Sequence, residues 1–195
     1  MAINNSKITT TGKLGTYHMV GLDSYEPQRT NNFELQVVLN EALQNKLKQV
    51  GITDYQEYLS LSVDSMAAPS VSNGELTIDR GNNTIKYAGR PTFDSRSITF
   101  NDYIGLDTEK ILEVWRSLVY NKETQEIGYA SEYKQQAYLI ELTTKGTVRN
   151  SWLMKGCWPS SFAPGDFDNK NNSVRQITMT LTYDWCTLIT NNALR

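Results

Sequence analysis

The sequence predicts a mainly β fold, a small β-barrel or sandwich with one flanking α-helix and a second helix in an insertion. Residues 175–185 alternate apolar and polar side chains without interruption, the period of a strand with one packed and one wet face. Shorter alternating segments are separated by Gly and Asn turns. Residues 108–120 instead carry an apolar stripe at helical spacing.

Composition narrows the range of functions. The chain has 195 residues, of which 39% are hydrophobic and 21% charged, with a formal net charge of −2. This length supports one domain with a core. The charge lacks the cationic surplus of a protein that grips phosphate backbones. No apolar run approaches the ~18 residues that span a bilayer, so we expect no membrane insertion. Cys157 and Cys186 are expected to be reduced, packed thiols.

The chain is expected to hold one domain. Residues 1–31 read as an irregular N-terminal arm, residues 32–186 as a single β domain, and residues 187–195 as a polar C-terminal tail. Residues 40–57 form a helical insertion, with helical spacing over residues 40–50 and a C-cap at Gly51. Residues 66–91 are dense in turn signals and form a long loop or hairpin. That excursion either pairs with the main sheet or serves as a binding loop.

Strand patterns account for most of the remaining domain. Apolar side chains alternate after Asn32 and again over residues 58–64, where Leu59, Leu61 and Val63 oppose two serines. The helix at residues 108–120 is expected to be capped by Asp107 or Thr108. Further strands are expected at residues 96–103, 137–143, 151–158 and 175–185.

Residues able to perform chemistry are sparse, and we predict no catalytic, cofactor-binding or metal-binding residues and no enzyme activity. His18 is the only histidine and lies far from both cysteines, which argues against a metal site or a catalytic triad. Four carboxylates do gather, and a pair of them would suit acid–base hydrolysis of a sugar. Their favoured interpretation is structural, one ordering a turn and two serving the helix start. They are Asp94, Asp102, Asp107 and Glu109.

Tryptophans leave a second interpretation open. Trp152, Trp158 and Trp185 would form a stacking platform if exposed, as in a carbohydrate-binding β-sandwich. Trp152 and Trp158 share a strand face with Met154, and Trp185 shares one with apolar residues of its own strand. Core packing is therefore the favoured prediction, with Trp115 of the helix meeting the same core.

Several motifs follow one another in a fixed order along the chain. They are residues 88–102 with a Gly89-x-x-Thr92-Phe93-Asp94 turn, the helix with Trp115, the strand start Tyr133-Lys134, the Lys155-Gly156-Cys157-Trp158-Pro159 element, and the final Thr- and Leu-rich strand. In this order the motifs resemble those of the tail-tube proteins of contractile-tailed bacteriophages, and the resemblance covers residues 32–185. The helical segment at residues 40–50 and the long N-terminal arm depart from the family pattern.

The resemblance implies a structural subunit that forms hexameric rings, which stack into a hollow conduit for DNA ejection inside a contractile sheath. The implied partners are further copies of the chain, the sheath, baseplate and tail-terminator proteins, and, in the lumen, the tape-measure protein and phage DNA bound without sequence specificity. The implied location is the virion tail, after assembly in the host cytoplasm. The alternatives are a tube-initiating baseplate or tail-terminal protein of the same fold, and the tube of a phage-derived injection system.

Two sets of residues follow as candidates for such assembly. A lumen wall must let DNA slide, so uncharged hydroxyl rows suit it, and these are Ser60, Ser62, Thr178, Thr180 and Thr182. Contacts between subunits are expected from the excursion at residues 66–91, whose candidates are Pro69, Asn73, Arg80, Asn82, Lys86 and Arg90.

Overall fold

The computed structural model describes residues 27–170 and 172–190, and the statements below concern that part of the chain. Of the predicted N-terminal arm only residues 27–31 fall within it, and of the predicted tail only residues 187–190. His18 lies outside the described residues. No helix among those described is long and apolar enough to cross a membrane.

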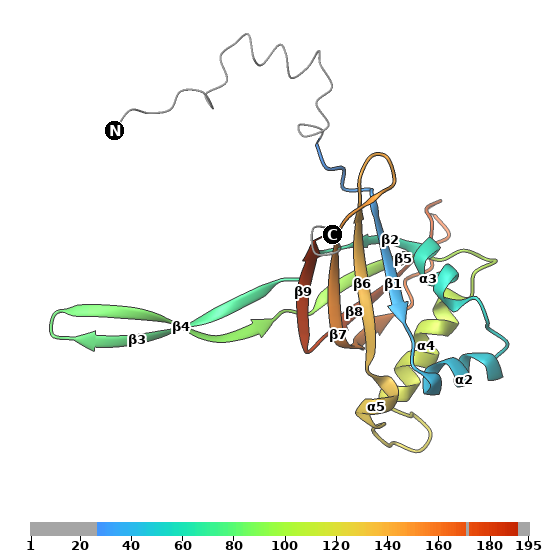
Figure 1. The fold of residues 1–195 in the computed structure, drawn as a ribbon. Coiled ribbons are helices and arrows are strands. Elements are labelled where there is room, and N and C mark those ends of the chain that lie inside the picture. Colours follow the sequence, from blue (N-terminus) through green and yellow to red (C-terminus); the bar gives the residue numbers. More distant parts are fainter. Residues whose placement is uncertain (1–26, 171, 191–195) are drawn as a thin grey trace, which may run out of the picture.

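One bent, seven-stranded antiparallel sheet organises the domain, as the mainly β pattern predicted (Figure 1). Its strand order is β1-β6-β7-β8-β5-β2, with β9 also paired to β7. The long strand β7 belongs to two half-sheets, because its first part lies between β6 and β9 and its second part pairs with β8. The strands are β1 Phe33–Val38, β2 Val63–Met66, β5 Arg96–Asn101, β6 Gln135–Leu142, β7 Val148–Ala163, β8 Gln176–Thr182 and β9 Trp185–Thr190.

A corner separates the two half-sheets. Lys155 pairs with Trp185 of β9, whereas Trp158 pairs with Thr182 of β8. Between them Gly156 has a φ of +70°, a conformation that favours glycine. The strand expected to continue to Trp185 therefore ends at Thr182, and the chain turns before starting β9. The predicted polar tail was wrong for residues 187–190, which continue β9.

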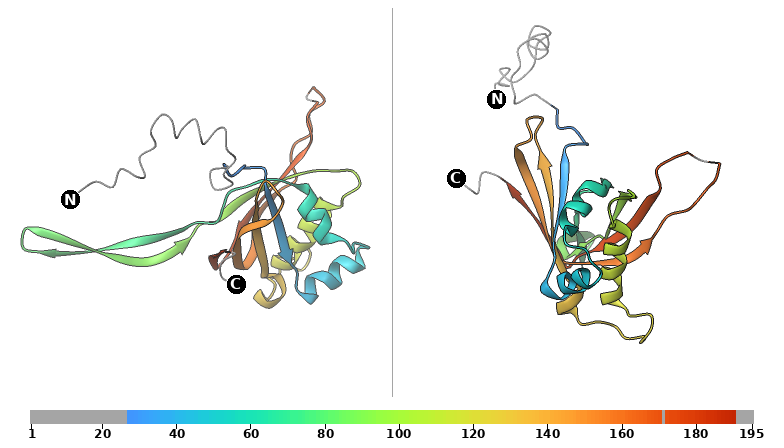
Figure 2. Two further views of the ribbon diagram at one scale, coloured as in Figure 1. Left: turned by 45° about the horizontal axis from the view of Figure 1, so that its top comes forward. Right: turned by 90° about the vertical axis from the view of Figure 1, so that its right-hand side faces the viewer.

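Helices cover the inner side of the sheet (Figure 2). They are α2 Glu41–Gln49, α3 Tyr55–Ser62, α4 Thr108–Val119 and α5 Ala130–Tyr133. The prediction of α2 is confirmed: the Asn40 side chain accepts a hydrogen bond from the Leu43 amide, and Gly51 has a φ of +86°. The prediction of α4 is confirmed as well, although the side chain of its N-cap, Asp107, makes no capping hydrogen bond.

The core lies between these helices and both half-sheets. Alternate residues of β8, namely Ile177, Met179 and Leu181, are at most 1% exposed. Trp115 of α4 is fully buried, as predicted, and its indole Nε1 donates to the Tyr133 carbonyl at 2.8 Å. This hydrogen bond satisfies the indole N–H inside the core and fixes α4 against the end of α5, just before β6.

The strand predicted over residues 58–64 was wrong. Residues 55–62 form helix α3, and only from Val63 does the chain enter β2. Leu59 is buried while Leu61 is 59% exposed, so the apolar residues do not share a face. Alternation over so few residues also fits a helix turn, and packing against β1 and α4 selects the helix.

The excursion at residues 66–91 is a long hairpin. Strands β3 Val71–Arg80 and β4 Asn83–Phe93 pair only with each other and project from the body as a twisted ribbon (Figures 1 and 2). The expected turn at residues 89–94 was wrong, because β4 runs on to Phe93 and only residues 94–95 separate it from β5. Among the described residues the hairpin strands do not pair with the main sheet, and only Met66, the first residue of the segment, does so as the end of β2.

Candidate assembly surfaces

The outward side of the second half-sheet is a continuous surface of hydroxyl groups. Thr178 of β8 pairs with Thr99 of β5, which in turn pairs with Ser65 of β2. One row further along, Thr180 lies between a serine of β5 and a serine of β7. Directly paired residues of adjacent strands point to the same side of a sheet. We call this surface the hydroxyl face; its members are Ser65, Ser95, Ser97, Thr99, Ser161, Thr178, Thr180 and Thr182.

Hydrogen bonds across the strands hold several of these hydroxyls in place. Ser161 Oγ donates to Thr180 Oγ1 at 2.8 Å, and Ser95 Oγ lies 2.8 Å from Thr182 Oγ1. None of the eight members is charged. At the margin, Asp64 accepts hydrogen bonds from Asn101 and Gln176. The face is therefore polar, slightly acidic at one edge, and free of cations that would hold a phosphate.

The two serines of α3 do not belong to the hydroxyl face. Ser62 is fully buried, where its Oγ donates to the Tyr58 carbonyl and meets Thr108 Oγ1 at 2.6 Å. Ser60 Oγ donates to the Leu35 carbonyl of β1 at 2.8 Å. Both hydroxyls tie α3 to its neighbours, because the segment is a helix and not the expected strand. The lumen-face assignment of Ser60 and Ser62 is therefore not retained.

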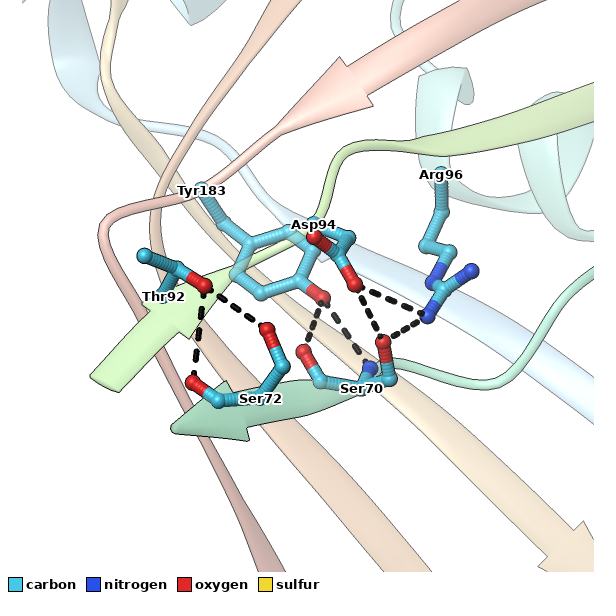
Figure 3. A network of polar contacts seen from close by, with 6 residues as sticks. All are labelled: Ser70, Ser72, Thr92, Asp94, Arg96 and Tyr183. Atoms are coloured by element: carbon cyan, nitrogen blue, oxygen red, sulfur yellow. Dashed lines mark hydrogen bonds and ion pairs between the residues drawn. The ribbon is translucent and has the colours of Figure 1, made fainter. Parts of the chain in front are cut away.

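A polar network anchors the base of the hairpin to the body (Figure 3). Ser70 Oγ donates to Asp94 Oδ2 at 3.0 Å and receives a hydrogen bond from Arg96. The Tyr183 hydroxyl, at the end of β8, accepts from the Ser70 amide at 3.3 Å, and burial raises the pKa of Tyr183. Ser72 and Thr92 join the two hairpin strands through hydroxyls 2.7 Å apart. These bonds fix the direction in which the hairpin leaves the sheet.

Beyond this base the hairpin has two different faces. Leu76 pairs with Tyr87 and Ile78 with Ile85, so these four side chains lie on one side of the ribbon. They are 55%, 48%, 41% and 37% exposed, respectively. We call them the apolar hairpin face. The opposite side is polar and carries the Lys86–Glu75 ion pair at 2.9 Å. A two-stranded ribbon with such a face is marginally stable alone and calls for a partner surface.

The predicted interface residues divide between the hairpin and the body. Asn73, Arg80, Asn82, Lys86 and Arg90 are all exposed on the hairpin. Pro69 is buried where the chain leaves the body, so its side chain is not available to a neighbour and its assignment is not retained. Sequence reasoning missed the apolar hairpin face, although the alternation of Leu76 with Ile78 was a visible signal.

The carboxylates considered for catalysis serve structural contacts. Arg175 Nη1, just before β8, binds Asp102 Oδ2 at 2.7 Å and Glu109 Oε2 at 2.8 Å. Asp107 pairs with Lys110 at 2.6 Å, and Asp94 belongs to the hairpin base. Within the described chain no cluster of three His, Cys, Asp or Glu side chains could hold a metal ion.

The tryptophans form no common platform. Trp152 packs against the core, and Trp158 meets the ring of Tyr133 edge-on at 6.0 Å. Trp185 is 42% exposed beneath the Lys155 ammonium, 5.5 Å from the ring centroid, so its expected core position was wrong. Trp185 is exposed because the chain turns at the corner. Asp184 and Trp185 are both exposed there, so the alternation of buried and exposed residues in β8 does not continue to Trp185. Gly156 likewise moves Trp158 off the face of Met154, to a position opposite Thr182.

Comparison with known proteins now decides the family. A family model described as "Phage tail tube protein" matches residues 28–187, which includes both half-sheets, the helices and the hairpin. The chain belongs to the phage tail tube protein family. The resemblance seen in the sequence is thereby confirmed, and the chain is a structural component of the tail tube type.

Individual relatives of this tail tube protein are distant. The tail tube protein of Serratia phage KSP90 is 24% identical over 117 residues, which cover 59% of this chain and 66% of that protein. The tube-terminating cap of the anti-feeding prophage superposes with a TM-score of 0.60 at 17% identity, over 97% of this chain and 99% of the other. A subunit from the sheath–tube complex of the PVC extracellular contractile injection system gives 0.56 at 16% identity, over 93% and 99%. At these identities the structural matches establish the fold.

Proposed function

We propose that this tail tube protein assembles into hexameric rings that stack into a hollow conduit, and that it has no catalytic role. The observation that carries the proposal is the second half-sheet, formed by β7, β8, β5 and β2. Within the part of the chain that the structure describes, it has two unpaired edges, and its outward face consists of hydroxyl groups.

The free edges supply the ring contact. On one side the half-sheet ends at β2, which pairs with no described strand other than β5. On the other side it ends at residues 158–163 of β7, since the pairing with β6 stops opposite Cys157. Unpaired strand edges are templates for pairing with another chain. Rotation about a ring axis brings β2 of one copy beside residues 158–163 of the next.

The strand directions agree with that closure. Each of the pairs β2–β5, β5–β8 and β8–β7 is antiparallel, so β2 and β7 run in opposite directions at the two edges. A rotation about an axis along the strands preserves direction, and the new pair is therefore antiparallel too. This heterologous contact closes a ring when the rotation closes, and it makes one continuous sheet.

The hydroxyl face then lines the channel. Thr178, Thr180 and Thr182 contribute the central row in every subunit, and Asp64 contributes a carboxylate at its margin. A wall of hydroxyls with no cation does not immobilise a polyanion, because it neutralises no phosphates. DNA and the tape-measure protein would pass along it without sequence-specific contacts.

The hairpin and the outside of the ring supply the remaining contacts. We infer that the hairpin reaches a neighbouring subunit through the region of Asn73, Arg80, Asn82, Lys86 and Arg90. Sheath, baseplate and tail-terminator proteins are the proposed outer and end partners. Support comes from the structural matches, which include a sheath–tube complex, a sheath/tube terminator and a baseplate. The proposed location is the virion tail.

A related role is that of a tube-initiating or tube-terminating protein with the same fold. The match to a tube-terminating cap favours keeping this candidate. Such a protein would form one ring and stop, whereas a tube subunit would polymerise. Negative-stain electron microscopy and light scattering of the purified protein separate the two roles. Long tubes of uniform width support the tube subunit, single rings support the capping role, and a dispersed monomer at high concentration contradicts both.

A further inference from the structure

A groove lies at the end of the second half-sheet where β5 passes into α4. It has a volume of about 510 Å³. Its apolar lining includes Val50, Tyr103 and Ile104, which are 54%, 44% and 110% exposed. Side chains of this size seldom stand so open together in a lone soluble domain without a partner surface.

The groove and the hairpin lie at opposite ends of the same half-sheet. The ribbon shows the hairpin and the connection from β5 to α4 on opposite sides of that half-sheet (Figures 1 and 2). The hairpin leaves from the end where β2 finishes at Met66 and β5 begins at Arg96. The groove starts at the other end of β5, after Asn101. Copies stacked along the strand direction therefore bring the hairpin of one ring to the groove end of the next.

The hairpin is long enough for this contact. Its strands β3 and β4 have 10 and 11 residues, so each is at least about 33 Å long at about 3.3 Å per residue. β5 has six residues, about 20 Å. A hairpin that continues beyond one end of the sheet therefore extends well over the next subunit.

Charge also matches between the two surfaces. Arg80 pairs with Asn83 at the hairpin tip, on the same side as the apolar hairpin face, and makes no ion pair within the described chain. The groove is lined by four carboxylates and one ammonium group. Glu113 forms exposed ion pairs with Lys122 at 2.7 Å and with Arg116 at 4.0 Å, and Asp107 forms one with Lys110 at 2.6 Å. Exposed ion pairs of this kind are weak. The remaining lone pairs of the two carboxylates can accept a guanidinium.

We propose that this groove receives the apolar hairpin face of a second copy in the adjacent ring, with Leu76, Ile78, Ile85 and Tyr87 over Val50, Tyr103 and Ile104 and with Arg80 at the acidic rim. The inference rests on the proposed tube. It adds the surface that accepts the hairpin and the axial direction of the contact.

Cross-linking of assembled protein tests the contact. Ile78→Cys is combined with Ile104→Cys, and the tubes are treated with a short bismaleimide and then denatured. Cys157 and Cys186 are buried and do not compete. The matched control combines Thr77→Cys, on the polar side of the same strand, with Ile104→Cys. The pair Tyr87→Cys with Tyr103→Cys provides a second test if the first double variant does not assemble.

An axial contact links each copy to one above and one below, so the ladder of products continues beyond six subunits. The control pair is expected to give no cross-linked product, so that only monomer is seen. A ladder that stops at six places the contact within a ring and overturns the axial assignment. Tubes in which neither test pair links more than the control overturn the groove. Absence of rings and tubes in the unmodified protein overturns the proposed function itself, which is a separate result.

Discussion

Gly156 packs directly against the carboxylate side chain of Asp184 at the corner where the two half-sheets meet. A Cβ at Gly156 would collide with that side chain, and the φ of +70° disfavours any other residue. Lys134 holds Asp184 by an ion pair at 2.6 Å, and the Asp184 amide donates to the Lys155 carbonyl at 3.0 Å. The bend that separates the hydroxyl face from the first half-sheet depends on this contact.

The first prediction concerns that corner. Gly156→Ala should lower the free energy of unfolding by about 2–5 kcal/mol, from backbone strain and from the collision with Asp184. Gly146→Ala is the matched control, because its φ is +77° but no atom lies near its Cβ position. It should cost only the strain, about 1–2 kcal/mol. Urea unfolding measures both variants, and equal losses would show that the packing at the corner contributes nothing.

The second prediction concerns Arg175, which links the end of β5 and the start of β8 to α4. Arg175→Met removes its ion pairs with Asp102 and Glu109 and should destabilise the fold by about 1–2 kcal/mol. The expected loss is smaller than that for two fully buried charged hydrogen bonds, because solvent screens the partly exposed Glu109. Lys110→Met, which breaks only the exposed pair with Asp107, should change stability by less than about 0.5 kcal/mol. Thermal denaturation ranks the two variants, and the reverse order would contradict this account.

Alkaline pH should destabilise the fold through Cys157. Burial raises the pKa of its thiol from 9.0 to about 12. The unfolded thiol loses its proton first, so between about pH 9 and pH 12 the unfolded state binds fewer protons and stability falls as pH rises. The slope approaches about 1.4 kcal/mol per pH unit for one thiol. Urea unfolding at several pH values should show a shallower decline in Cys157→Ala, and an unchanged slope would count against the assignment.

A cation placed on the hydroxyl face should leave the fold of the subunit intact but should impair passage of DNA through the channel. Thr180→Lys keeps the buried side of β8 intact and loses mainly the hydrogen bond from Ser161, about 1 kcal/mol. Tubes should still assemble, while one added cation per subunit retains DNA and lowers infectivity. Thr144→Lys, on the exposed β6–β7 turn, is the control and should remain infectious. Equal infectivity of the two particles removes Thr180 from the channel wall.

The apolar hairpin face should be required for tube assembly but not for the stability of the isolated subunit. Ile78→Asp places a charge at a side chain that is 41% exposed in the single chain, so the thermal midpoint of the dissociated subunit should change little. Tubes should be lost, because the charge would be buried without a partner in the stacked contact. Thr77→Asp, on the polar side, should still form tubes. Electron microscopy compares them, and tubes from Ile78→Asp would show that this face is not used.

Much of this architecture was predictable from periodicity. The alternation over residues 175–182 predicted strand β8, and it also predicted that Ile177, Met179 and Leu181 lie on the face opposite the threonines. Such a pattern is reliable because a strand with one buried face needs apolar side chains at every second residue. Asn40 and Gly51 marked both ends of α2 for equally local reasons.

The missed features depend on contacts distant in sequence. Leu59, Leu61 and Val63 alternate over too few residues to separate a strand from the helix that they partly form. The corner at Gly156 depends on Asp184, which no local pattern reveals. Ser65, Ser97 and Ser161 join the hydroxyl face only through strand register, so the sequence supplied one row of the surface and the structure supplied its neighbours.

A cryo-electron microscopy reconstruction of the assembled protein tests the central claim most directly. The account predicts a hollow tube whose inner wall is the antiparallel sheet of β7, β8, β5 and β2, closed by pairing β2 with residues 158–163 of the neighbour, with Thr180 facing the channel. A tube whose inner wall is built from β1, β6 and β9, or one in which Thr180 faces outward, would contradict it.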